Sequence, residues 1–158
     1  MNKRVSAAEM SGDDFRALGH DLIDRIAEMI DGIDRFNVAQ PVSPKEMKAL
    51  LPSGGMPPQG SPAGPIFREV LSNLAQTSTL NSHPRFFGYI SGAPAPAAIL
   101  AELVASALNP NCGAWILSPL ASEIENQTIQ WLAELLDYPR PCDGILVSGG
   151  NMANMVCF

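Results

Sequence analysis

The segment GILVSGGNMANMVCF, residues 144–158, joins an apolar run to a glycine turn. Its first part, 144–147, is fully apolar, which is typical of a strand buried on both faces of a parallel sheet. A small-residue turn, Ser148 to Asn151, follows, and a helix is predicted to begin at Met152. A strand that turns into a helix presents unpaired backbone N–H groups at the positive end of the helix dipole, an arrangement that binds phosphate.

The turn is a weak motif by itself. It has neither the lysine of a P-loop nor the glycine spacing of a dinucleotide fingerprint. On these residues alone it is either an anion site or a purely structural connection between a strand and a helix. A single strand cannot bury both of its faces, so we expect the rest of the sheet to come from residues that this sequence does not contain.

Two helices are predicted before this strand. Pro96 can start the first, whose apolar positions stop at Asn109, and Ser118-Pro119 can start the second, which should end before Pro139. The run FFGYI at 86–90 is aromatic and favours a short strand.

The N-terminal part is predicted to be helical as well. Residues 13–35 carry apolar side chains at helical spacing, with Ser11 as the expected N-cap. Ser43 to Glu46 form a capping box that should start a short helix. Residues 52–65 are rich in proline and glycine, which predicts a linker, and a further helix should begin at Ile66.

Composition excludes several classes of protein. The chain has 158 residues and a net charge of −6, which disfavours nucleic acid and anionic membrane surfaces as partners. No stretch has the roughly 20 apolar residues that a membrane span requires. The three cysteines are far apart, which fits neither a disulfide framework nor a zinc site, so we expect no metal. We expect a soluble, cytoplasmic protein.

Three segments in succession carry a resemblance to a known family. They are HPRFFGYISGAPAPAAILAELVASALNPNCGAW at 83–115, SPLASEIENQTIQWLAELLDYP at 118–139, and GILVSGGNMANM at 144–155. In order and spacing they resemble the N-terminal third of the pyridoxal-phosphate-dependent group II amino-acid decarboxylases. That family includes the aromatic-L-amino-acid, glutamate and cysteine-sulfinate decarboxylases. The upstream segment FRALGHDLIDRIAEMID and the capping-box helix resemble its N-terminal helical arm.

The resemblance implies an α/β protein of the type I fold, mostly helical over these residues, with the first strand or strands of the large-domain sheet. Residues 1–80 would form the N-terminal arm, and 81–158 would begin the domain that binds the cofactor, pyridoxal 5′-phosphate. It also implies a carboxy-lyase that releases CO2 from an L-amino acid to give an amine. The family's active site lies at the interface of a homodimer.

Site residues follow from the same resemblance, position by position. Gly150 and Asn151 match the pair that binds the cofactor phosphate, and Ser148 and Gly149 complete that turn. Family members commonly have Ser or Thr where this chain has Asn151. The positions that match the substrate pocket are Tyr89, Ile90 and Ser91, together with Asn111, Cys112 and Gly113 of a loop that reaches the partner subunit's active site.

The family's Schiff-base lysine has no counterpart in this sequence. The three lysines are Lys3, Lys45 and Lys48, and all precede the predicted linker. The resemblance places the catalytic lysine beyond residue 158, so we expect a fragment of a decarboxylase that is inactive by itself. The alternative is a complete, non-catalytic helical module for dimerisation or protein interaction.

Overall fold

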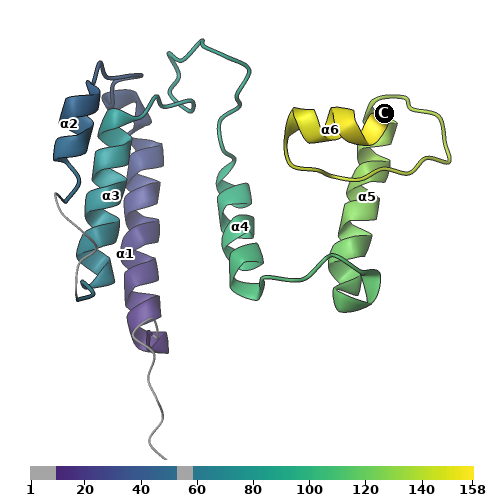
Figure 1. Cartoon of the computed structure of the whole chain (residues 1–158), viewed down its shortest axis with the longest axis horizontal. Helices are drawn as coiled ribbons and strands as arrows, with labels where there is room; N and C mark the ends of the chain where they lie inside the picture. Colours follow the sequence, from purple (N-terminus) through teal and green to yellow (C-terminus); the bar gives the residue numbers. More distant parts are fainter. Residues whose placement is uncertain (1–9, 53–58) are drawn as a thin grey trace, which may run out of the picture. The chain divides into compact units, whose positions relative to one another are not determined.

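The computed structural model describes residues 10–52 and 59–158. The contacts divide the chain into two units, Met1–Pro94 and Ala95–Phe158. All regular elements in the described residues of both units are helices, and none of these residues forms a β-strand. The elements, labelled in Figure 1, are α1 (Gly12–Asp31), η1 (Ile33–Arg35), α2 (Pro44–Ala49), α3 (Ala63–Thr77), α4 (Pro96–Leu108), η2 (Trp115–Leu117), α5 (Pro119–Leu135) and α6 (Gly149–Cys157).

Helix α1 begins where the sequence predicts and ends earlier. The Ser11 hydroxyl accepts a hydrogen bond from the backbone N–H of Asp14 at 3.0 Å, which confirms Ser11 as the N-cap. At the other end, the N–H of Gly32 donates to the carbonyl of Glu28 at 3.0 Å. The chain then continues as the short 3-10 helix η1, so the helix predicted over 13–35 stops at Asp31.

Helices α1 and α3 lie side by side in the first unit (Figure 1). Asp21 of α1 joins them, because its carboxylate accepts from Arg25 at 3.0 Å on the same helix and from Arg68 of α3 at 3.2 Å. The hydrogen bond from Arg25, followed by that from Arg68, lowers the pKa of Asp21. Helix α1 is therefore tied to α3 by a carboxylate that both guanidinium groups keep ionised.

The capping box forms as predicted at the start of α2. The Ser43 hydroxyl accepts from the N–H of Glu46, and the Glu46 carboxylate accepts from the backbone N–H of Ser43 at 2.7 Å. Helix α3 begins at Ala63, three residues before the predicted start, so the end of the predicted linker is helical. Pro65 is tolerated there because it has no backbone N–H, and the first helical turn offers no intrahelical acceptor for one. Residues 53–58 of that linker lie outside the described residues.

Neither predicted strand is present. Residues 86–90 and 144–147 have no regular secondary structure, although both are rich in residues that favour strands. A strand requires hydrogen bonds to a neighbouring strand, and the described parts of the chain supply none. At 86–90, Tyr89 also has a φ of 58°, which is incompatible with an extended run. The expected first strand of the sheet is therefore absent from this structure.

The second unit contains α4, α5 and α6. Pro96 and Pro119 occupy the first turn of α4 and α5, as predicted, and Asn109 ends α4 in the left-handed conformation with a φ of 42°. Among the described residues Ala133 is the one buried apolar side chain, and many large apolar side chains of both units are exposed. No helix in the described ranges is long and apolar enough to cross a membrane.

Candidate functional site

The candidate site is the turn that leads into α6. Ser148 stands at the N-cap in an extended conformation (φ −79°, ψ 103°), and its side chain makes no capping hydrogen bond. Gly149 follows with a φ of +80°, a conformation that glycine adopts without strain. The helix begins at Gly149, three residues before the predicted start at Met152. The turn is therefore shorter than predicted, and the helix N-terminus lies within the predicted phosphate-binding residues.

Four backbone N–H groups at a helix N-terminus have no acceptor within the helix. In α6 these belong to the N-cap and the first three helical residues, which are Ser148, Gly149, Gly150 and Asn151. All four residues are exposed, and the first turn carries no acidic side chain. A Cβ added at Gly149 or Gly150 would meet no atom within 4 Å. The turn is thus open, and its donors and dipole fit a phosphate group.

Helix α5 supports the segment that leads to this turn. The backbone N–H of Leu146 donates to Oε1 of Glu125 at 2.9 Å. Nearer the start of the segment, a Cβ at Gly144 would lie 3.0 Å from the Cγ2 of Ile129, so a larger residue there would need the Ile129 side chain to shift. Residues 144–147 therefore run alongside α5, and the Glu125 side chain takes a hydrogen bond that a neighbouring strand would take in a sheet.

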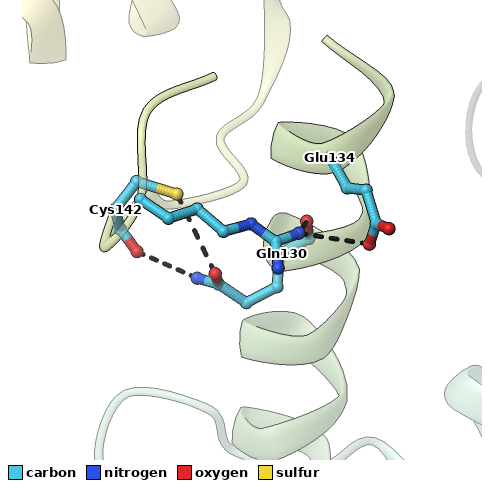
Figure 2. Close-up of polar contacts among 4 residues, drawn as sticks. Gln130, Glu134 and Cys142 are labelled. Atoms are coloured by element: carbon cyan, nitrogen blue, oxygen red, sulfur yellow. Dashed lines mark hydrogen bonds and ion pairs between the residues drawn. The ribbon is translucent and has the colours of Figure 1, made fainter. Parts of the chain in front are cut away.

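A polar cluster on α5 holds the start of the same segment. Figure 2 shows the side-chain amide of Gln130 donating to the backbone carbonyl of Cys142, and the N···O distance is 2.9 Å. Arg140 donates to the backbone carbonyl of Gln130 at 2.8 Å and to the carboxylate of Glu134 at 3.2 Å. The chain between α5 and the turn is therefore attached to α5 through Cys142 as well as through Leu146.

The second predicted site segment in this unit is the loop between α4 and α5. Asn111 accepts a hydrogen bond from the N–H of Gly113 at 2.9 Å through its own side chain, which fixes a local turn. Cys112 is exposed, and its thiol lies 3.8 Å from the carbonyl oxygen of Pro110. At the end of the loop, the Trp115 indole N–H donates to the Glu123 carboxylate at 2.8 Å.

The third predicted site segment, Tyr89 to Ser91, belongs to the first unit. Tyr89 adopts a left-handed conformation that is uncommon for a residue with a large side chain, and its ring lies 6.5 Å from that of Phe86. Tyr89 and Ile90 are almost fully exposed. Upstream, His83 is buried and its Nδ1 accepts from the N–H of Arg85 at 3.0 Å, which orders the turn before this segment.

The structure thus brings together the four predicted phosphate residues in one turn. Sequence patterns missed Glu125 and Gln130, which support that turn from α5. Both are half-buried polar residues within a helix, and their role depends on a segment more than ten residues away. Helical periodicity contains no signal for such a contact. No group of side chains in the described residues is suited to hold a metal ion.

Comparison with known proteins identifies the class to which this fold and turn belong. The family described as "Pyridoxal-dependent decarboxylase conserved domain" matches residues 44–158. Phenylacetaldehyde synthase of Petunia hybrida is 33% identical over 139 residues, which cover 88% of this chain and 27% of that protein. Aromatic-L-amino-acid decarboxylase of Bacillus atrophaeus is 28% identical over 147 residues, covering 93% of this chain and 30% of that protein.

Solved structures agree with the sequence comparisons. Catharanthus roseus tryptophan decarboxylase, solved in complex with L-tryptophan, matches with a TM-score of 0.73 and 26% identity over 82% of this chain and 28% of its own. Oryza sativa TDC, solved with PLP and tryptamine, matches with a TM-score of 0.75 and 28% identity over 85% of this chain and 28% of its own.

The chain belongs to the pyridoxal-dependent decarboxylase family, whose members are carboxy-lyases that use pyridoxal phosphate. This confirms the resemblance found in the sequence. Its structural neighbours are pyridoxal-phosphate decarboxylases of the type I fold. The chain spans less than a third of the length of the relatives described above.

Proposed function

We propose that these residues form part of a pyridoxal-phosphate-dependent amino-acid decarboxylase and contribute the phosphate-binding turn of its cofactor site. The observation that carries the proposal is the geometry of 148–151. A left-handed glycine stands at the start of α6, and the exposed helix N-terminus carries no acidic side chain, in a chain of this family. When bound, the cofactor supplies an electron-accepting ring, which makes the loss of CO2 from an amino acid possible.

The chain's own residues would anchor that group. Backbone N–H groups of Gly149, Gly150 and Asn151 would donate to phosphate oxygens, and the Ser148 hydroxyl is free to add a side-chain donor. Asn151 can donate through its amide where relatives commonly have a hydroxyl. These contacts hold the phosphate end and thereby fix the orientation of the ring.

The substrate proposal rests on the relatives' names. Two of them are named aromatic-L-amino-acid decarboxylase and tryptophan decarboxylase, which favours an aromatic L-amino acid as substrate, with CO2 and an amine as products. Tyr89, Ile90 and Ser91 in the first unit, and Asn111 and Cys112 in the second, are proposed pocket residues. Each set is exposed and accessible to a ligand.

We also propose a homodimer in the cytoplasm, with the active site at the subunit interface. Both units expose large apolar side chains, among them Phe15 and Phe67 in the first and Trp131 and Leu135 in the second. Apolar surface of this extent is covered in a protein that stays in solution, by further residues of the decarboxylase or by the second subunit.

The 158-residue chain by itself is proposed to lack catalytic activity. Lys45 and Lys48 are exposed on α2, whereas a lysine that reacts with a cofactor aldehyde is activated by desolvation or a neighbouring cation. The purified chain should release no CO2 from labelled L-tryptophan, L-tyrosine or L-glutamate in the presence of the cofactor. Release above the protein-free rate would overturn this part of the proposal.

The phosphate site is tested separately from catalysis. Pyridoxine 5′-phosphate and pyridoxine differ in the phosphate alone, and neither has an aldehyde that reacts with lysine. Titration of the purified chain by calorimetry should show binding of the phosphorylated compound and much weaker binding of pyridoxine. Equal affinities, or no binding of either compound, would contradict the proposed site.

A further inference from the structure

Glu125 of α5 has no part in the site predicted from the sequence, yet it touches the segment that positions the turn. Its half-buried carboxylate accepts the backbone N–H of Leu146 at 2.9 Å. Leu146 precedes Ser148 by two residues. The anchored atom therefore lies within about 7 Å of extended chain from the turn.

We propose that Glu125 is a positioning residue for the cofactor-phosphate turn, an inference that rests on the proposed function. In a sheet the N–H of Leu146 would donate to a neighbouring strand, whereas here it donates to the Glu125 carboxylate. This hydrogen bond fixes the direction in which residues 147–149 leave α5. The close approach of Gly144 to Ile129, four residues further along the helix, fixes the other end of the same short segment. Two contacts on one face of α5 thus set the position of Ser148 and Gly149.

The carboxylate has two effects of opposite sign on a bound phosphate. As an acceptor it orders the turn, which favours binding because less conformational entropy is lost when the ligand arrives. As a negative charge near the turn it repels an anion and disfavours binding. Glutamine at this position keeps an acceptor oxygen and removes the charge, so the two effects can be separated.

The substitutions Glu125→Ala and Glu125→Gln test the inference, with Gln127→Ala as a control at an exposed position of the same helix. Calorimetry would give the affinities for pyridoxine 5′-phosphate and pyridoxine. We expect E125A to weaken binding of the phosphorylated compound about fivefold, the effect of one lost hydrogen bond, with no change for pyridoxine. E125Q should bind it as tightly as the wild type, or about twofold more tightly, and Q127A should match the wild type.

Amide hydrogen exchange of the free proteins gives a second readout that does not need a ligand. E125A should speed exchange at Leu146, and E125Q should restore the wild-type rate. If the wild type binds pyridoxine 5′-phosphate and E125A has the same affinity and the same exchange rate at Leu146, this inference alone is overturned. A wild type that shows no preference for the phosphorylated compound would instead overturn the proposed function on which it rests.

Discussion

The indole Nε1 of Trp115 donates a hydrogen bond to Oε1 of Glu123 across a distance of 2.8 Å, and this contact joins η2 to α5. The loop between α4 and α5, which carries Asn111 and Cys112, is thereby attached to the same helix that supports the proposed phosphate turn. Both proposed site segments of the second unit thus depend on side chains of α5.

Replacing Trp115 by phenylalanine should loosen this loop. The variant keeps an aromatic ring and loses the N–H donor, so the free energy of unfolding should fall by about 0.5–1.5 kcal/mol. Amide exchange should increase at Asn111 to Gly113. Trp131→Phe is the matched control, because both indoles are 59% exposed. An equal loss of stability in the two variants would show that the hydrogen bond to Glu123 contributes nothing specific.

Alanine at position 149 should destabilise the turn, and alanine at position 150 should not. Gly149 has a φ of +80°, so a Cβ adds backbone strain of about 1–2 kcal/mol even though it meets no neighbouring atom. Gly150 belongs to α6 and also has open space around it, so alanine there should be neutral or slightly stabilising. Chemical denaturation of both variants measures the difference, and the reverse order of stabilities would contradict the geometry of the turn.

Gln130→Ala should detach the start of the segment shown in Figure 2. The variant loses the 2.9 Å hydrogen bond to the carbonyl of Cys142, and we expect a cost of about 1 kcal/mol. Gln127→Ala is the control, because Gln127 is exposed on the same helix. Thermal unfolding should show a lower midpoint for Q130A than for Q127A. Identical midpoints would mean that the Gln130 contact does not hold Cys142.

The start of α2 should depend on pH through Glu46. Hydrogen bonds from the hydroxyl and then the backbone N–H of Ser43 lower the pKa of this carboxylate. A lowered folded-state pKa contributes stability above the unfolded value, and that stability is lost as the pH falls through the folded value. The amide resonance of Ser43 should therefore shift with a midpoint below that of an unperturbed glutamate. A normal midpoint, or the same titration in a Ser43→Ala variant, would contradict the capping box.

Local signals in the sequence predicted most of the helices correctly. Ser11, the Ser43 capping box, and the prolines at 96 and 119 each specify a helix start through contacts within one turn. The same reasoning predicted a glycine turn after the apolar run, and the structure has a turn there that leads into α6. The resemblance to the decarboxylases was likewise sufficient to identify the family.

Features that depend on distant residues were not predictable in this way. The apolar run 144–147 has the composition of a buried strand, yet it lies along α5 because strand pairing needs a neighbour that the described residues do not provide. Tyr89 takes a left-handed conformation within a run that favours strands. Glu125 and Gln130 acquire their roles only when α5 and the following segment meet.

The proposed function requires the backbone of 148–151 to bind the cofactor phosphate. Amide chemical shifts of the isotopically labelled chain, recorded during titration with pyridoxine 5′-phosphate, report on each of these residues. We expect large, saturable shifts at Gly149, Gly150 and Asn151, and none at these residues when pyridoxine is added instead. Shifts confined to other parts of the chain, such as the arginines Arg25, Arg35 and Arg68 of the first unit, would contradict the claim.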